Sequence, residues 1–544
     1  MLRVSIVLVS AALVGWLATD ALAAPNVQRV AKQVDRLLAE ELFDDSTELA
    51  PPVDDATFLR RVWLDLVGDI PSPEHTTAFL LDPSPDKRDR VIRDLLASDQ
   101  YGQNWARYWR DVILSRRIED RAVLVANPLV TMLTEELNAG TGWDEVATKF
   151  ITAVGDVRED GSTAILMAQD GVTEDSTAEF SRIFLGIQIQ CAQCHDHPYD
   201  RWKREQFHEL AAFFPRTAVR QVNTATKRSF AVITNDGRDV RRGNNNNLNR
   251  RGAAEHYMPD LDDPSARGER MQPKFFLTGD EVPIGTRDAK RRESIAEWMT
   301  QSDWFATAYV NRMWAELVGE GFYEPIDDMG PDRKPNGAKA VELLSQQFAA
   351  SGYDPKWLMR VILNTEAYQR ECRPRRLPEE TAFTANVAQP LRGDQLFNSL
   401  LTTLELDEAT VRSMVSGGAG RAYGARFSPR DVFNVAFGFD PSVPRETITS
   451  SIPQALAMMN QPQINRSLSA GSRRRPTSLG KLIAGVEDDD MLTSELFLRT
   501  LCREPTDEEL EQVSAYAQSV DDRTESYEDL LWSLINSTEY IYRK

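Results

Sequence analysis

The segment Cys191-Ala192-Gln193-Cys194-His195 holds the residues whose types and spacing could do chemistry. Two thiols three positions apart can form thioether bonds with the two vinyl groups of a haem, and the imidazole that follows them can ligate the iron. The chain has 4 Cys and 5 His among 544 residues, so random placement predicts on the order of 3 × 10⁻⁴ such motifs. The spacing therefore predicts haem c, with Cys191 and Cys194 as covalent anchors and His195 as the proximal ligand.

Three alternatives stay open for the same segment. The two thiols could form a structural or redox-active disulfide, or they could remain an inert pair. Zinc or another divalent metal could also bind, although two histidines would meet one ion only if the chain made a sharp loop at Pro198. The ligands of that site would come from Cys191, Cys194, His195 and His197, with Asp196 and Asp200 nearby.

A haem would need a second axial ligand from another segment, from water, or none. His208 follows His195 by thirteen residues and could return on the next helix. His75, His256 and several Met are formal candidates, and the sequence does not distinguish them. For His208 alone, a partly buried helix histidine is the more frequent role.

Other potential ligands lie elsewhere in the chain. Cys372 and Cys502 each stand alone in amphipathic segments, which favours buried thiols, and a disulfide between them stays open. Glu324, Asp327 and Asp328 could form a carboxylate cluster for a hard cation. A helix cap or a solvated loop is the commoner role for such residues.

The N-terminal segment is typical of a secretory signal. A basic residue at position 3 precedes an apolar run from Val4 to Ala18, and small residues precede cleavage after Ala23 or Ala24. The apolar run is shorter than the ~20 residues that span a bilayer. The sequence therefore predicts a signal peptide over 1–23, export to the periplasm or cell surface, and no transmembrane span after cleavage. Export agrees with haem c, which is attached outside the cytoplasm.

Hydrophobic periodicity predicts the elements that must position this segment. From Val27 to Leu42 apolar residues recur at helical spacing, and similar patterns continue to about residue 215 and again from about 286. We expect a mainly α fold with two helical domains, 27–215 and 286–544. A small β-containing connector over 216–285 would join them.

Within that connector, β-branched runs flank Asn235-Asp236-Gly237 and predict a β-hairpin with its turn there. A polar loop from Gly243 to Gly252 follows. The connector is locally rich in arginine, but it lacks the interleaved aromatic residues of a base-stacking surface, which favours a solvated loop.

Composition excludes several classes of protein. Lys and Arg number 63 against 83 Asp and Glu, which gives a net charge of −20, and such a charge repels nucleic acid. Hydrophobic residues make up 42% of the chain, which is typical of a soluble globular protein. The sequence also lacks the short motifs of serine hydrolases, zinc proteases, P-loop proteins and dinucleotide-binding proteins.

Two long stretches resemble known families. FLGIQIQCAQCHDHPYDRWKREQFHELAAFF, with DDATFLRRVWLDLVGDIPSP upstream, resembles the cytochrome-c-associated domain of planctomycete-type secreted proteins, domain-of-unknown-function family 1549. IAEWMTQSDWFATAYVNRMWAELVGEGFYEPIDDMGP and REPTDEELEQ resemble its usual C-terminal companion, family 1553. Together the resemblances cover nearly all of the mature chain.

The resemblance implies an exported, mainly helical, two-domain protein whose haem motif is Cys191, Cys194 and His195, with His197 in the same signature. It also implies a partner that resembles a secreted sulfatase or phosphatase. Some members carry a separate N-terminal cytochrome c domain, which we do not find here. RKPNGAKAVELL stands where members tend to carry a Ser-His-Pro element, so a histidine of that element is missing.

These observations together predict an exported haem-c-binding redox or electron-transfer protein, and they leave open its substrate and whether it is an enzyme. The alternative is a non-haem secreted scaffold or polysaccharide-related protein. In that case the CxxCHDH segment would bind a structural metal or form a disulfide.

Overall fold

The structure is a computed structural model. It describes residues 24–544 except 224–227, 237–250, 264–265, 267, 375–379, 410, 412–428, 444–453, 455–457, 459–461, 473 and 521. The predicted signal peptide over 1–23 and most of the predicted polar loop therefore lie outside the described residues. In the part of the chain that is described, no helix is both long and apolar enough to cross a membrane.

Helices build most of the described chain, which confirms the predicted mainly α fold. The first half contains α1 Val27–Leu42, α2 Asp55–Val67, α3 Pro73–Leu81, α4 Lys87–Ala97, α5 Asp99–Leu114, α6 Ala126–Ala139, α7 Trp143–Thr152, α8 Ala164–Ala168, α9 Thr173–Leu185 and α10 Arg204–Ala211, with the 3₁₀ turns η1 Asp120–Val125, η2 Gly161–Thr163 and η3 Ile189–Gln193.

The second half is also helical. It contains α11 Asp288–Thr300, α12 Asp303–Val318, α13 Ala338–Ala350, α14 Pro355–Leu363, α15 Glu366–Gln369, α16 Gly393–Thr403, α18 Pro429–Phe437, α20 Pro462–Leu468, α21 Ser478–Gly485, α22 Asp489–Leu501, α23 Asp507–Ser519, α24 Arg523–Ile535 and α25 Thr538–Ile541.

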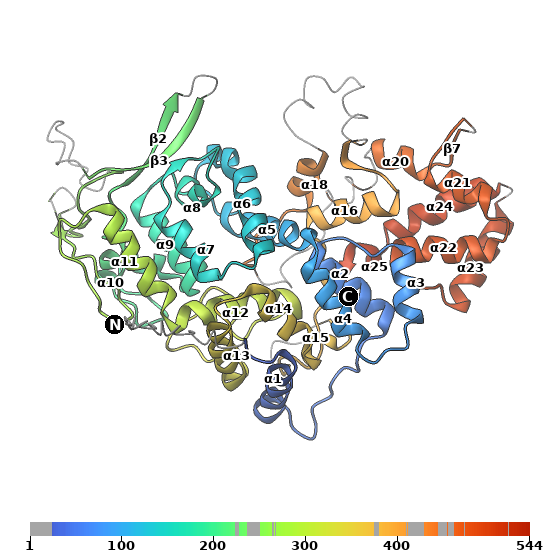
Figure 1. Ribbon diagram of the computed structural model, residues 1–544, viewed down its shortest axis with the longest axis horizontal. Helices are drawn as coiled ribbons and strands as arrows, with labels where there is room; N and C mark the ends of the chain where they lie inside the picture. Colours follow the sequence, from blue (N-terminus) through green and yellow to red (C-terminus); the bar gives the residue numbers. More distant parts are fainter. Residues whose placement is uncertain are drawn as a thin grey trace, which may run out of the picture.

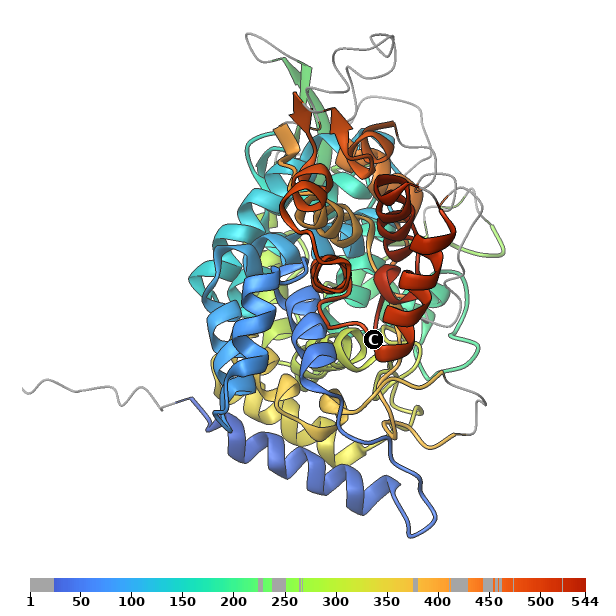
Figure 2. The same cartoon turned by 90° about the vertical axis from the view of Figure 1, so that its right-hand side faces the viewer.

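Two groups of helices lie side by side (Figure 1). One contains α6 to α12, and the other contains α2 to α4 together with α16 to α25. Helix α1 lies along one end of the molecule (Figure 2), where it packs against α13 and α14. Its sequence explains this position, because Val30, Val34 and Leu38 form one buried stripe at helical spacing. The Asn26 side chain caps its first turn by accepting a hydrogen bond from the Arg29 amide.

The structure has two hydrophobic cores, and their boundary does not coincide with the boundary between the two groups of helices. The larger core takes residues from α1 to α15 and so includes both sides of the 216–285 segment. At its centre the rings of Trp109 and Trp143 stack with centroids 4.3 Å apart, and Tyr309 lies 4.8 Å from Trp143. The smaller core joins Leu64 and Ile70 to residues from 391 to 540. Helices on both sides of the 216–285 segment therefore share one interior.

The strands are short. Strand β1 (Gly155–Asp156) pairs with β3 (Arg228–Thr234), which pairs with β2 (Thr217–Asn223) in an antiparallel ladder. The remaining strands form two-stranded ladders: β4 Tyr257–Met258 with β5 Glu269–Arg270, β6 Gln389–Pro390 with β9 Tyr542–Arg543, and β7 Gly471–Ser472 with β8 Arg475–Pro476.

The predicted position of the hairpin turn is wrong. The two long strands are joined through 224–227, and Asn235 and Asp236 come after the second strand. Both residues are engaged outside the sheet. The Asn235 side chain donates to the Gly252 carbonyl at 2.7 Å, and Asp236 Oδ1 accepts from the Asp288 amide at 2.9 Å, at the start of α11. Asp236 therefore ties the sheet to the next helix instead of starting a turn.

Candidate functional site

The CxxCH segment lies in the loop between α9 and α10. Helix α9 does not run on into Cys191. Helix α9 ends at Leu185 because Gly186 takes the left-handed conformation, with φ +67°. A Cβ at Gly186 would lie 2.8 Å from Met329 Cε, so glycine also allows this close approach. The chain then reverses into η3, which carries Cys191.

The three residues of the motif are accessible. Cys191 and Cys194 are free thiols and exposed, and His195 is exposed as well. His195 Nδ1 lies 2.7 Å from the carbonyl oxygen of Asp196, so Nδ1 carries the proton and donates it. Nε2 is then the basic nitrogen, and no side chain of the described residues bonds to it. This is the usual arrangement of a metal-ligating histidine, whose other ring nitrogen donates to a carbonyl.

Hydrogen bonds of Asp196 and His197 stabilise the loop that follows the motif. The Asp196 carboxylate accepts from Lys203 Nζ at 2.8 Å and from the Arg204 amide at 3.1 Å, so it caps the start of α10. The hydrogen bond from Lys203 lowers the pKa of Asp196. The His197 amide donates to the Trp202 carbonyl at 2.8 Å, and His197 Nδ1 accepts from the Tyr199 amide at 3.3 Å.

The alternative metal site needs at least three of these side chains around one point. Nowhere in the described chain do three His, Cys, Asp or Glu side chains come together in a way that could hold a metal ion. The two thiols and the imidazole of the motif are exposed on this turn, and in the described structure they do not form such a group.

His208 lies on α10 beneath the loop and is 1% exposed. Its Nε2 lies 3.0 Å from the carbonyl oxygen of Gln193, and its Nδ1 lies 2.8 Å from His256 Nε2. Burial lowers the pKa of His208 to about 4 and that of His256 to about 3, so both rings are neutral at pH 7. Both nitrogens of His208 are therefore engaged, and neither is offered as an axial ligand.

The two other histidine candidates do not face the loop either. His256 is fully buried, and its Nδ1 lies 3.9 Å from Glu174 Oε1 on α9. His75 lies on α3 in the other group of helices, where its Nδ1 is 2.9 Å from Ser72 Oγ and its ring packs on Trp63. The structure thus brings His208 close to the motif as a neighbour, and it places His75 elsewhere.

Sequence reasoning missed a buried ionic cluster at the start of the loop. Asp327 is 1% exposed. Its Oδ2 accepts from Arg182 Nη1 at 2.9 Å and from Arg312 Nη2 at 3.3 Å, and its Oδ1 accepts from Gln188 Nε2 at 3.0 Å. Burial alone would raise the pKa of Asp327, but the charges of Arg182 and Arg312 outweigh it and hold that pKa well below its ordinary value.

Asp327 has none of the three expected roles, because among the described residues it joins no cation cluster, caps no helix and is not in a solvated loop. Its neighbours have separate partners: Glu324 accepts from the Gly321 amide at 2.6 Å, and Asp328 pairs with Arg333. The sequence does contain one indication of this cluster. Asp327 follows an aromatic-rich helix that carries Arg312, and such an acidic residue can form a buried ion pair with an arginine of that helix. Its second partner, Arg182, lies 145 residues away.

The cluster also ties the CxxCH loop to the second half of the chain. Arg182 Nη2 bonds Glu179 at 2.6 Å and the Val112 carbonyl at 2.9 Å, and its Nη1 bonds Ser442 Oγ at 2.9 Å. The Met329 amide donates to the Gly186 carbonyl at 2.7 Å.

The outer part of the loop meets the same segment. Asp200 packs so closely on Gly330 that a Cβ there would collide with the carboxylate. Next to it, Arg201 pairs with Asp332. Residues 327–332 therefore form one wall of the CxxCH loop.

The remaining two cysteines are not joined to each other. Cys372 is half-buried, and its Sγ lies 3.6 Å from Arg61 Nη2. Cys502 is fully buried, as expected, with its Sγ 4.0 Å from the Pro71 carbonyl. Both are free thiols.

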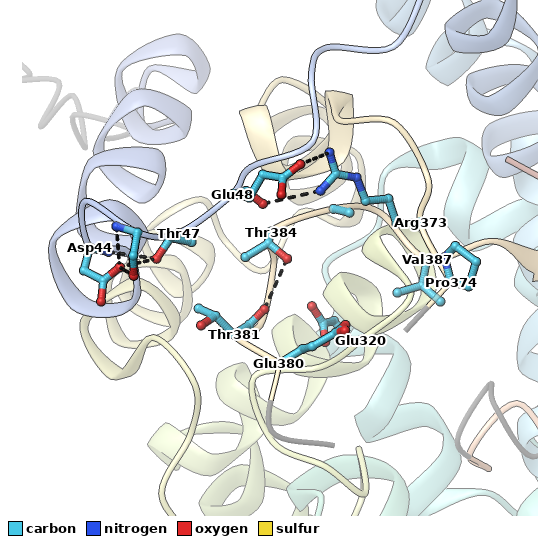
Figure 3. A pocket seen from close by; sticks show the side chains of 12 residues that line it. Asp44, Thr47, Glu48, Glu320, Arg373, Pro374, Glu380, Thr381, Thr384 and Val387 are labelled. Atoms are coloured by element: carbon cyan, nitrogen blue, oxygen red, sulfur yellow. Dashed lines mark hydrogen bonds and ion pairs between the residues drawn. The ribbon is translucent and has the colours of Figure 1, made fainter. Parts of the chain in front are cut away.

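A separate cavity of about 650 Å³ lies between the segment after α1 and residues 373–374 and 380–387 (Figure 3). Carboxylates and hydroxyls line much of it, and Arg373 pairs with Glu48 at 3.5 Å across its edge. None of its lining residues belongs to the CxxCH loop. This cavity is therefore not part of the site.

Two separate regions of the chain match models of known families. Residues 33–219 match the family model PSCyt2, described as a protein of unknown function (DUF1549), and residues 291–416 match PSD1, a protein of unknown function (DUF1553). No curated protein and no solved structure matches the chain. The CxxCH motif falls in the first region, and Arg312 and Asp327 fall in the second. The chain therefore carries in tandem a region that matches the DUF1549 model and a region that matches the DUF1553 model.

Proposed function

We propose that this chain is an exported haem-c-binding redox or electron-transfer protein. Cys191 and Cys194 would be its covalent anchors, and His195 would be its proximal ligand. The observation that carries the proposal is the bond between His195 Nδ1 and the Asp196 carbonyl at 2.7 Å. It selects the tautomer with a basic Nε2 on an exposed imidazole, and the two free thiols of the motif are exposed as well. One imidazole nitrogen and two thiols are the groups that haem c requires.

Two further observations support the proposal. The name of the first family model, PSCyt2, hints at a cytochrome association. The N-terminal sequence has the features of a secretory signal, and haem c is attached outside the cytoplasm. We accordingly place the protein in the periplasm or at the cell surface. A secreted sulfatase- or phosphatase-like protein is the partner that the resemblance suggests.

Each part of the loop has a role in this proposal. The Asp196 carbonyl orients the imidazole, and the Asp196 carboxylate fixes the turn by accepting from Lys203 and Arg204. The exposure of the thiols allows a maturation system to reach them. A bound haem would supply one-electron chemistry, and the identity of its distal ligand would tune its potential. The ring nitrogens of His208 are not offered for that position.

The test is a pyridine haemochrome spectrum of protein exported from a host with an active cytochrome c maturation system. Wild type and the half-buried thiol control Cys372→Ser should both give a c-type spectrum. The double variant Cys191→Ser, Cys194→Ser should be exported and colourless. A colourless wild-type protein that is exported in full would contradict the proposal.

A further inference from the structure

The CxxCH turn rests on a buried pair of histidines from two different segments. His208 comes from α10, which packs against η3, and His256 directly precedes β4. Their rings stack with centroids 5.1 Å apart and an interplanar angle of 21°. The backbone of His256 is itself fixed, because its carbonyl accepts from the Met271 amide at 3.0 Å.

The contacts of this pair determine which nitrogen carries each proton. The Gln193 carbonyl can only accept, so His208 Nε2 must be the donor in the 3.0 Å bond. The ring of His208 is neutral, and its Nδ1 is therefore an acceptor. His256 Nε2 must then donate across the 2.8 Å contact. The chain of donors runs in one direction, from His256 through His208 to the backbone of the motif.

The carbonyl at the end of this chain needs a donor. Gln193 is the last residue of η3, and the final carbonyls of a helical turn have no partner within the turn. Gln193 is half-buried, and a carbonyl that is partly shielded from water loses stability when its donor is removed. Gln193 also lies directly between the two anchoring positions, because it precedes Cys194 and follows Cys191 by two residues.

We infer that His208 is a positioning residue that fixes the CxxCH turn by capping the Gln193 carbonyl, and that His256 holds His208 in the required tautomer. The inference rests on the proposed function only for the purpose of the turn, since the positioning can be measured without haem. It also explains why His208 is buried next to the motif although both of its ring nitrogens are engaged and neither is left for a haem iron.

The test compares hydrogen exchange of the loop peptide 189–203 in protein exported without haem maturation. His208→Phe removes the donor and should raise the exchange rate of this peptide roughly tenfold, as the loss of one buried hydrogen bond predicts. His208→Gln carries an amide at about the position of Nε2 and should stay within about twofold of wild type. His208→Asn carries its amide near Nδ1 and should behave like His208→Phe. The remote control His75→Gln should leave the peptide unchanged.

Tryptophan fluorescence reports whether each variant keeps the larger core folded, because Trp109 and Trp143 stack within it. If His208→Phe loses the native fluorescence, the Gln and Asn variants decide the question alone. Equal exchange in those two variants, or unchanged exchange in a folded His208→Phe, would overturn the inference. A wild-type protein that never binds haem would remove the proposed function, whereas the exchange result would still stand or fall separately.

Discussion

The most direct perturbation of the wall behind the CxxCH loop is Asp327→Asn. This substitution keeps the shape of the side chain and removes its charge. The wild-type carboxylate accepts three hydrogen bonds, from Arg182, Arg312 and Gln188. An asparagine can accept with one oxygen only, and its amide group would face donors.

The expected cost follows from which charges lose their partner. Breaking a buried ion pair by removing one member costs about 3 to 5 kcal/mol. Arg182 keeps the carboxylate of Glu179 at 2.6 Å, so the loss falls mainly on Arg312. We therefore expect the free energy of unfolding to fall by about 3 kcal/mol, near the lower end of that range.

The assay is urea denaturation followed by tryptophan fluorescence at pH 7. The matched control is Asp332→Asn, which breaks the exposed pair with Arg201. That change should shift the free energy of unfolding by less than about 0.5 kcal/mol, because exposed pairs contribute little. Equal denaturation midpoints for wild type, Asp327→Asn and the control would refute the assignment of Asp327 as the centre of a buried cluster.

Three further predictions concern the same region. Gly186→Ala should lower the free energy of unfolding by about 1 to 3 kcal/mol, measured in urea, because its φ is positive and Met329 lies against it; an unchanged midpoint would contradict this. His208 and His256 have folded-state pKa values of about 4 and about 3, below their ordinary 6.5. As the pH falls, the unfolded chain binds protons before the folded chain does, so the contribution of these two histidines to the free energy of unfolding should be complete above pH 6.5 and should be lost as the pH falls towards 4. Urea midpoints measured from pH 7 to 4.5 should therefore fall less steeply in His208→Gln than in wild type, and equal slopes would contradict this prediction. In haem-free protein a thiol reagent should label the two CxxCH cysteines rapidly and Cys502 only after unfolding, whereas rapid labelling of Cys502 in native protein would disprove its burial.

Local patterns in the sequence predict much of the fold. The helix α1 is predicted from the sequence because its apolar residues recur at helical spacing, and the structure confirms both the helix and the burial of that stripe. The CxxCH motif is found by spacing alone. The end of α9 could also have been placed, because Gly186 follows an apolar helix and glycine is a usual stop signal there.

Pairings between distant residues could not be predicted in this way. Nothing near Asp327 indicates Arg182, and nothing near His208 indicates His256, which is 48 residues away. The hairpin turn predicted at Asn235-Asp236-Gly237 is wrong for the same reason, because a contact between distant residues decides the structure there. Asp236 precedes a glycine and reads locally as a turn residue, but it bonds to the first amide of α11, and only the tertiary fold brings these two together.

The central claim is that haem is covalently attached at Cys191 and Cys194. The most direct measurement is the intact mass of the purified, denatured protein after export with active cytochrome c maturation. A thioether-linked haem survives denaturation, so the account predicts the mass of the mature chain plus one haem, reduced to the bare chain in Cys191→Ser, Cys194→Ser. A wild-type protein with the mass of the bare chain would contradict the claim.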